Sequence, residues 1–333
     1  MNKRVIKSVL KKKFNDWVLS IKDENVKKLI EKNTIITGGA IASMLLKEKV
    51  KDYDVYFTDK ETTKAVAEYY VEKFNKSKGG TFKNRLGYNI KAIVVDGKDI
   101  EDKTPEFMSQ YANQLKCPSH MIQNVDPDRI KILIRSDGVA GEDINLDVPF
   151  EDYMERVEDG DELPEEALKD DKKEKYRPVF LSSNAITLSE RIQIVIRFHG
   201  NVEKIHKNYD YVHCMNAWTS ENNKLHLRQD ALESLITKNL VYNGSKYPVC
   251  SVIRMRKFIK RGWYINAGQI IKMLFQISKL DLTDVAMLED QLVGVDSAYF
   301  TNFIDVLRKK FEENKDFKLE EQYVNTVIDR IFG

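Results

Sequence analysis

The residue types best suited to chemistry lie between positions 34 and 57, where two glycines precede two aspartates. Gly38 and Gly39 follow the segment TIIT, and Asp52 and Asp54 stand on either side of a tyrosine in KDYDVYF. Glycines at a strand-to-helix turn let the backbone approach a bulky anion and present N–H groups at the helix start. This half of the pattern predicts a phosphate-binding turn.

The two aspartates predict a metal site beside that turn. Residues two apart on a strand point to the same face, so the carboxylates of Asp52 and Asp54 repel each other unless they share a cation. Mg²⁺ prefers oxygen ligands and takes further ones from substrate phosphates. We therefore expect Asp52 and Asp54 to bind Mg²⁺ together with substrate phosphates.

Hydrophobic spacing predicts the elements that must position these residues. Residues 4–31 read as one or two amphipathic helices, whose lysine-rich face is either solvated or in contact with a phosphate backbone. The segment that follows alternates strand and helix, which indicates a mixed α/β layer. The expected strands are 34–37, 54–57 and 89–95, and the expected helices are 40–49 and 60–76.

The middle of the chain has a different composition. Residues 151–171 contain eleven Asp or Glu against two Lys or Arg, which indicates an exposed acidic loop. A short strand is expected at 130–134, and we interpret 98–178 as an insertion. After this insertion, strands are expected at 185–188, 192–198 and 209–214, and a short helix is expected to begin at Val202.

The last third of the chain is expected to be helical. The predicted fold class is α/β (α+β), a mixed β-sheet core with a C-terminal helical domain. The predicted domains are an N-terminal helical segment over 1–33, the sheet core over 34–218 and the helical domain over 219–333. The expected helices of that domain are 229–239, 248–261, 266–277, 282–290, 297–312 and 318–331.

The run TGGAIASMLLKEKVKDYDVYF resembles the active-site signature of the DNA polymerase β-like nucleotidyltransferase superfamily, which includes CCA-adding enzymes, poly(A) polymerases and oligoadenylate synthases. That signature has Gly-Gly or Gly-Ser and, about a dozen residues later, Asp-x-Asp or Asp-x-Glu. The chain also looks like uncharacterised nucleotidyltransferase-like proteins of large tailed bacteriophages, especially over YPVCSVIRMRKFIKRGWYINAGQ and LEDQLVGVDSAYF. The resemblance implies a nucleotidyltransferase core that uses two Mg²⁺ ions and an NTP.

The superfamily has a third carboxylate on a neighbouring strand, and the sequence offers two candidates. We favour Asp210, because an acid between Tyr209 and Tyr211 on a buried strand needs a reason such as a metal. Asp96, at the end of NIKAIVVD, is the alternative, and a third possibility is that neither residue has this role. With Asp210, the expected catalytic and metal-binding set is Asp52, Asp54 and Asp210.

A basic helix is the second chemical feature of the sequence. Residues 251–261 contain five Lys or Arg in eleven positions. At 100° per residue, Arg254, Lys257 and Arg261 share one face with Ser251 beside it. A basic stripe with a hydroxyl predicts a triphosphate clamp or an RNA groove, and a solvated face is the alternative. The expected core-facing residues on the opposite side are Val249, Val252, Met255 and Ile259.

Composition excludes some classes of protein. The chain has 54 basic and 52 acidic residues, a formal net charge of +2, so a polyanionic partner must bind through local clusters. Apolar runs of 18 residues and the apolar core of a signal peptide are not found, so neither membrane association nor secretion is expected. The chain has three cysteines, Cys117, Cys214 and Cys250. Three cysteines cannot all pair with one another, which favours reduced thiols. We expect a cytoplasmic protein, in the host cytoplasm if it is viral.

These observations lead to one expected reaction. Gly38, Gly39, Ser251, Arg254 and Lys257 would bind the NTP, and the three aspartates would hold the metal ions. A nucleoside monophosphate would pass to a hydroxyl acceptor, with an RNA 3′ end as the leading acceptor. The alternatives are nucleotidylation of a protein Ser, Thr or Tyr, and a non-catalytic nucleotide-binding, nucleic-acid-binding or virion-associated protein on the same fold.

Overall fold

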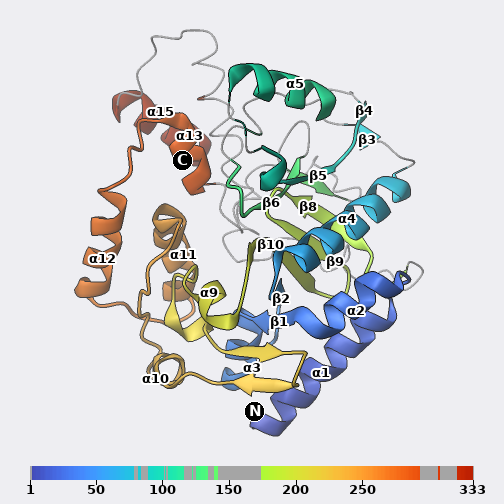
Figure 1. Cartoon of the computed structure of the whole chain (residues 1–333). Helices are drawn as coiled ribbons and strands as arrows, with labels where there is room; N and C mark the ends of the chain where they lie inside the picture. The colour runs from blue at the N-terminus through green and yellow to red at the C-terminus, as the bar shows by residue number, and fades with distance from the viewer. Residues whose placement is uncertain are drawn as a thin grey trace.

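A computed structural model of the chain contains an eight-stranded mixed sheet between two groups of helices (Figure 1). The structure describes residues 2–78, 82–83, 89–100, 102, 104–115, 122, 125–133, 139–141, 174–292, 307 and 321–332. The strands of the sheet run in the order β12-β11-β1-β2-β10-β9-β8-β7. Neighbours are antiparallel except β2 and β10, which are parallel. The mixed sheet with flanking helices confirms the predicted fold class.

The strands of this sheet come from distant parts of the chain. β1 and β2 belong to the glycine and aspartate segment, whereas β7 to β12 follow more than eighty residues later. The bounds are β1 Thr34–Thr37, β2 Tyr53–Phe57, β7 Val139–Gly141, β8 Pro178–Ser182, β9 Ala185–Leu188, β10 Ile192–His199, β11 Ala217–Thr219 and β12 Lys224–His226.

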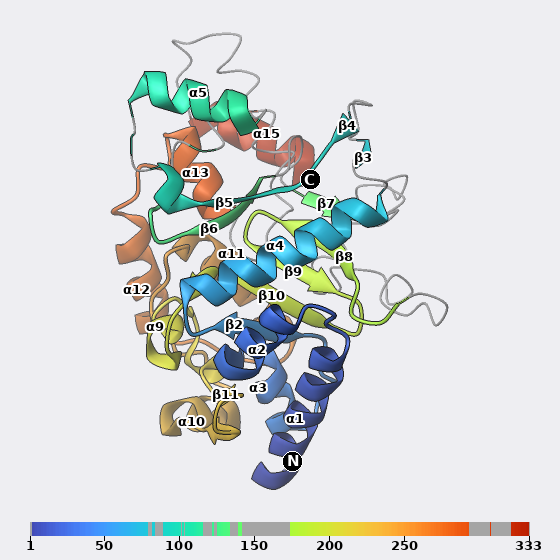
Figure 2. The ribbon, with the colours of Figure 1, turned by 45° about the vertical axis from the view of Figure 1, so that its right-hand side comes forward.

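One face of the sheet is covered by α1 (Lys3–Leu19), α2 (Glu24–Asn33) and α4 (Lys60–Ser77), and Figure 2 shows α4 running across it. Alternation along β2 points Val55 and Phe57 into this layer, where both are fully buried. Trp17 of α1 donates from Nε1 to Tyr70 Oη of α4 at 2.7 Å, so the indole is satisfied inside the core. These contacts hold β2 in place on the face of the sheet that α1, α2 and α4 cover.

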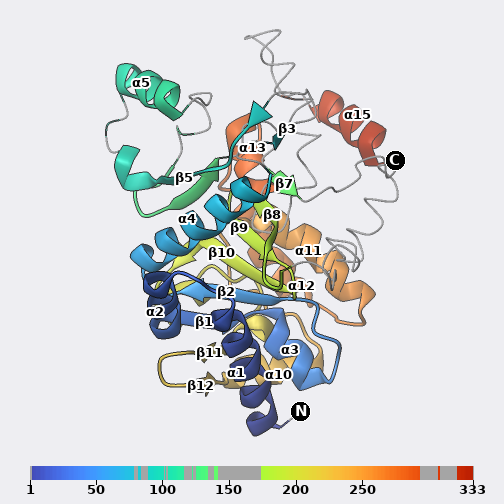
Figure 3. The ribbon, with the colours of Figure 1, turned by 90° about the vertical axis from the view of Figure 1, so that its right-hand side faces the viewer.

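The opposite face of the sheet carries Asp54 and Tyr56 and meets the C-terminal helices, as Figure 3 shows. Tyr56 packs with Val195 of β10 and Ile205 of α9 in a small buried cluster. A larger aromatic cluster around Tyr211, Phe258 and Trp263 joins the helices to the sheet. The helices on this side are α3 Gly39–Leu46, α9 Val202–His206, α10 Gln229–Thr237, α11 Pro248–Lys260, α12 Ala267–Ile277 and α13 Val285–Leu292.

A smaller unit lies at the top of Figure 1. β5 (Ile93–Asp96) and β6 (Ile130–Leu133) form a separate antiparallel pair, and η1 (Gly97–Ile100) and α5 (Pro105–Leu115) lie between them in the chain. This unit has its own buried cluster, which includes Val95, Met108 and Leu133. The remaining elements are β3 Phe82–Lys83, β4 Asn89–Ile90, η2 Val212–Cys214 and α15 Glu321–Phe332.

Most expected elements are present, with three corrections. The strand expected over 89–95 is divided into β4 and β5, because the Asn75 amide bonds both the N–H and the C=O of Ala92. The strand expected over 209–214 is wrong, since the chain bends there and continues into η2. Neither β11 nor β12 was expected. The acidic segment 151–171 and the helix expected over 297–312 lie outside the described residues, apart from Leu307.

The bend in place of the expected strand has a local cause. The N–H of Tyr211 donates to the Asp210 carboxylate at 2.9 Å, and the Asn243 N–H donates to the Asp210 carbonyl at 2.8 Å. Short side-chain-to-backbone bonds of this kind compete with a strand ladder. Only a single bridge, between Tyr211 and Tyr242, remains of a sheet-like pairing.

Candidate phosphate and metal site

Asp54 lies directly against the glycine turn. Thr37, the last residue of β1, is opposite Asp54 in the antiparallel pairing with β2. Gly38 follows with a φ of +87° and precedes the first turn of α3. A Cβ at Gly38 would meet Asp54 Oδ2 at 2.3 Å, whereas one at Gly39 would meet no atom within 4 Å. Gly38 is therefore required both by its backbone conformation and by the carboxylate beside it.

A buried histidine supports the end of β1. The Thr37 hydroxyl lies 2.8 Å from the carbonyl of Asn216 and 2.8 Å from His206 Nε2. Because the hydroxyl gives its single proton to the carbonyl, His206 donates from Nε2 to Thr37 Oγ1. Burial lowers the pKa of His206 to about 4, and the nearby Arg228 acts in the same direction. His206 is therefore neutral at pH 7 and serves to position Thr37.

Cys214 lies between the glycine turn and Asp210. The Gly38 N–H donates to the Cys214 carbonyl at 3.2 Å. Burial raises the pKa of the Cys214 thiol, and the carboxylates of Asp210 and Asp54 both raise it further. Both acids therefore lie near one residue, although 156 positions separate them in the sequence. The thiol is protonated at neutral pH and is a poor nucleophile.

Asp210 forms an ion pair with Arg254 of α11. One carboxylate oxygen accepts from the guanidinium Nη1, and the other accepts from the Tyr211 N–H. The Asp210 side chain is 11% exposed, so the pair is held largely away from water. Tyr211 Oη also donates to the carbonyl of Ser251 at 2.7 Å. These bonds attach α11 to the bend that carries Asp210.

The face that α11 turns inward differs from the expected one. Ser251 and Phe258 are buried and Arg254 is half-buried, whereas Ile259 is 47% exposed. The expectation that Ile259 faces the core is wrong, because the Asp210 ion pair and the Phe258 ring direct the opposite stripe inward. Val252 and Met255 are half-buried against the aromatic cluster, and Val249 packs toward α13.

The other predicted phosphate ligands are distributed around this helix. The Ser251 hydroxyl donates to the Tyr247 carbonyl at 3.2 Å, which is a bond within its own helix. Lys257 is half-buried on α11. Arg261, which was placed on the same face, bonds Glu48 at 2.6 Å on the surface. Arg254 of α11 thus reaches Asp210, one of the predicted acids.

Gln193 is a site residue that the sequence interpretation missed. In the parallel pairing of β10 with β2, Gln193 lies opposite Asp54 and is 7% exposed. The resemblance implies a third carboxylate on a neighbouring strand, and β10, one of the two neighbours of β2, has an amide opposite Asp54. The strand IQIVIRF contains no acid. Only the parallel pairing, which local spacing does not reveal, could have identified this residue.

Asp96, the alternative third acid, lies elsewhere. It ends β5, in the two-stranded sheet, and faces α4. Lys60 Nζ is 2.5 Å and Lys64 Nζ is 3.6 Å from its carboxylate. Although partial burial acts to raise it, the pKa of Asp96 is lowered by the bond from Lys60 and by the N–H of Lys98. Asp96 therefore holds a helix to a strand and does not join the Asp54 site.

The donor set fits a metal ion only in part. In the regions that the structure describes, no three His, Cys, Asp or Glu side chains are grouped so that they could hold one. β2 begins at Tyr53, so Asp52 directly precedes the strand on which it was expected. Asp52 and Asp54 have the oxygen chemistry that Mg²⁺ prefers, provided that substrate phosphates complete the coordination. Asp210, as placed here, bonds Arg254 instead.

The chain is thus an α+β protein whose mixed sheet carries Asp54 beside a glycine turn, with Asp52 two residues earlier, directly before β2. The family model of the Gabija anti-defense 2 proteins matches residues 8–238, more than half of the chain, so the chain belongs to this family. A relative in Bacillus phage SPbetaL7, named Gabija anti-defense 2, is 24% identical over 143 residues. That match covers 42% of this chain and 33% of the phage protein, so the chain spans about a third of the relative's length.

A comparison with solved structures finds the CCA-adding enzyme of Thermotoga maritima in complex with tRNA. The match has a TM-score of 0.32 and 11% identity and covers 90% of this chain and 55% of the enzyme. A likeness at this level does not establish a common fold. Within the described residues, no helix combines the length and the apolar character needed to cross a membrane.

Proposed function

We propose that the protein counters a host defence system and does so as a metal-dependent nucleotidyltransferase. The observation that carries the enzymatic part is the contact of Gly38 with the Asp54 carboxylate, which brings together the two halves of the signature. The anti-defence part is supported by the family to which the chain belongs. The substrates would be an NTP and a hydroxyl acceptor, with an RNA 3′ end first and a protein hydroxyl second.

The site residues have distinct roles in this proposal. The backbone at Gly38 and Gly39, at the start of α3, would hold the triphosphate. Asp52 and Asp54 would hold Mg²⁺, which supplies charge neutralisation on the phosphates. The acceptor oxygen would attack the α-phosphorus in line, pyrophosphate would leave from the opposite side, and the hydroxyl proton would pass to solvent.

The ion pair of Asp210 with Arg254 suggests how the site changes when the NTP binds. A triphosphate is a stronger bidentate partner for a guanidinium than one carboxylate, because it carries more charge. Arg254 would then exchange Asp210 for the phosphates, and Asp210 would be released toward Asp54. The carboxylates of both acids raise the pKa of the Cys214 thiol, and this shared neighbour supports the exchange.

Transfer can be measured directly. The protein would be incubated with each α-labelled NTP and Mg²⁺, in parallel with bulk RNA, with protein and without acceptor. We expect label on one acceptor class and its loss with EDTA. Asp54→Asn should lower the incorporation at least about a hundredfold, because metal-bound charge stabilisation is worth several kcal/mol. Asp16→Asn, an exposed acid on α1, is the matched control. Equal incorporation by the two variants would refute the enzymatic proposal.

A second candidate function is inhibition by binding a host defence protein. α12 exposes neighbouring apolar side chains at its surface and buries only Met273 fully. A group of exposed large apolar residues on one helix is typical of a protein interface. The exposed residues are Ile270 at 36%, Ile271 at 50%, Leu274 at 56% and Phe275 at 68%.

A further inference from the structure

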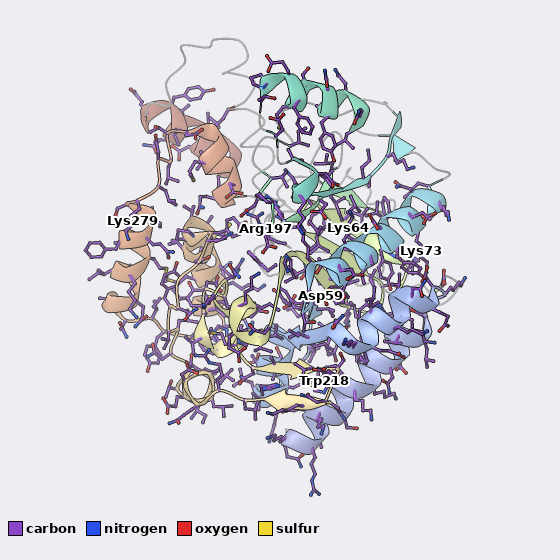
Figure 4. The ribbon with its side chains drawn as sticks, in the orientation of Figure 1. Asp59, Lys64, Lys73, Arg197, Trp218 and Lys279 are labelled. Carbon is purple, nitrogen blue, oxygen red and sulfur yellow. The ribbon has the colours of Figure 1, made fainter. Side chains whose placement is uncertain are left out.

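Two arginines lie at the neighbouring elements β6 and β10, close to the start of α11. Arg129, directly before β6, is 8% exposed, and its Nη2 donates to Asn184 Oδ1 at 2.7 Å. Arg197 of β10 donates from Nε to Tyr247 Oη at 2.7 Å. Figure 4 shows Arg197 between the sheet and the helices α11 and α13. Neither arginine is used by the site around Asp54.

The buried arginine has an unused donor. Arg129 Nε is shielded from solvent and has no hydrogen-bond partner among the described residues. Burial lowers the pKa of Arg129 to about 10, and the charge of Arg197 acts in the same direction. Two guanidinium groups near each other in a poorly solvated place are costly unless an anion lies between them. An unpaired donor beside a second cation is therefore a reason to expect a bound anion.

Further groups around the arginines favour an anion of high charge. Lys246 Nζ is 5.9 Å from the Phe198 ring centroid and 4.0 Å from the Asp126 carboxylate. α11 begins at Pro248, directly after Tyr247, and the Tyr247 side chain gives its first turn no cap. The start of a helix of thirteen residues carries partial positive charge.

The acids in this region are on its exposed side. Asp126 is opposite Lys246 and 58% exposed, and Asp290 of α13 is exposed as well. Asp290 and Asp126 both raise the pKa of Arg129, but less than burial and Arg197 lower it. Water screens exposed carboxylates, so they compensate the two arginines incompletely.

We propose that Arg129, Arg197 and the start of α11 bind a phosphate group, and that this phosphate belongs to the backbone of a polynucleotide. This assignment rests on the proposed function, because it identifies the acceptor of the proposed transfer as a polynucleotide. Arg197 lies four residues beyond Gln193 on β10, about 13 Å along a strand. Gln193 is opposite Asp54, so this phosphate is distinct from those held at Gly38. A ligand with phosphates that far apart is a polynucleotide strand.

The test measures binding without turnover. A 5′-labelled single-stranded RNA of twelve nucleotides is titrated with the full chain in EDTA, without NTP, and its anisotropy is recorded at several salt concentrations. Arg197→Gln keeps a donor for Tyr247 and removes the charge. We expect it to weaken binding about tenfold and to lower the salt slope by about 0.7, the value for one phosphate contact on a single strand. Lys279→Gln, two residues beyond the end of α12 and labelled in Figure 4, should change neither quantity by a comparable amount.

A second measurement separates the sources of the phosphate. Labelled ATP is titrated against the same variants, and thermal midpoints are recorded with and without inorganic phosphate. We expect ATP affinity to be unchanged in Arg197→Gln, and phosphate to raise the midpoint of the wild type more than that of the variant. Loss of ATP binding with unchanged RNA binding would overturn the polynucleotide assignment.

Three further results would overturn the proposal. The first is a wild type that does not bind the RNA even at low salt. The second is an Arg197→Gln variant with the wild-type affinity and salt slope. The third is a variant whose thermal midpoint falls while RNA binding is unchanged, because Arg197 would then only join the sheet to α11. Loss of NTP incorporation is a separate outcome, since this assay contains neither metal nor NTP.

Discussion

Gly38 and Asp54 are in such close contact that a methyl group in place of a glycine hydrogen would lie 2.3 Å from Asp54 Oδ2. Gly38→Ala must therefore displace the carboxylate and also force alanine to a φ of +87°. We expect a loss of about 1–3 kcal/mol in the free energy of unfolding and a loss of NTP incorporation.

The adjacent glycine provides the control. Gly39 is in the first turn of α3, and a Cβ there would meet no atom within 4 Å. Gly39→Ala should leave the protein as stable as the wild type or more stable by about 0.4–1 kcal/mol, because alanine loses less backbone entropy. Urea denaturation of the two variants measures both effects. If Gly38→Ala and Gly39→Ala were equally stable, the contact with Asp54 would not constrain the turn.

The pair of Asp210 and Arg254 makes a prediction that separates structure from catalysis. Arg254→Met leaves a nearly buried carboxylate without its partner, so we expect a loss of about 2–3 kcal/mol. Adding Asp210→Asn should restore most of that stability, since no unpaired charge remains. Arg261→Met, which breaks an exposed pair with Glu48, should cost less than about 1 kcal/mol.

Activity of the double variant tests whether the pair takes part in the site, since the proposal assigns Arg254 to the triphosphate and Asp210 to the metal. If Asp210 takes part in the metal site after NTP binding, the restored double variant remains inactive in NTP incorporation. A double variant that is stable and as active as the wild type would show that Asp210 has only a structural role. Because stability is restored in either case, this result does not depend on misfolding.

The features that the sequence predicts well depend on neighbouring residues. β1 and β9 have the expected bounds, because TIIT and AITL are short apolar runs with polar residues at their ends. The close approach of Gly38 to Asp54 also follows from a signature within about twenty residues. Local spacing was therefore sufficient for the glycine turn and the strand beside it.

The features that the sequence did not predict depend on distant pairing. Gln193 becomes opposite Asp54 only when β10 pairs with β2, which lies 139 residues earlier. The inward face of α11 is set by the ion pair of Arg254 with Asp210. The sequence of α11 has apolar residues on several sides of the helix, so a helical wheel alone cannot show which side faces inward. β11 and β12 have three residues each, too few for a period of two to be visible.

The free energy of unfolding should depend on pH through His206. The folded pKa is about 4 and the ordinary value is 6.5, so the unfolded chain binds the proton first as the pH falls. Stability from this residue is complete above about pH 6.5 and is lost progressively toward pH 4. Between pH 7 and pH 5 the loss is about 2 kcal/mol.

Substitution of His206 isolates this effect. His206→Gln keeps a group that can bond Thr37 and removes the titration, so its stability should change less between pH 7 and pH 5 than that of the wild type. Urea denaturation of both proteins at the two pH values gives the difference, because contributions from other titrating groups cancel. Parallel pH profiles of the two proteins would contradict the buried, neutral state of His206.

The exposed face of α12 separates inhibition by binding from inhibition by nucleotide transfer. Leu274 and Phe275 are 56% and 68% exposed, so Leu274→Glu and Phe275→Glu should leave stability nearly unchanged. In a host that carries Gabija, both variants should lose protection of an infecting phage if this face binds a defence protein, while NTP incorporation stays at the wild-type level. Lys279→Gln, which changes the charge by the same amount beyond the end of the helix, is the control for charge. Asp54→Asn, whose α12 face is intact, should lose both NTP incorporation and protection if transfer is what matters, and should keep protection if binding through α12 is sufficient. A Phe275→Glu variant that protects as well as the wild type would exclude this face as the interface.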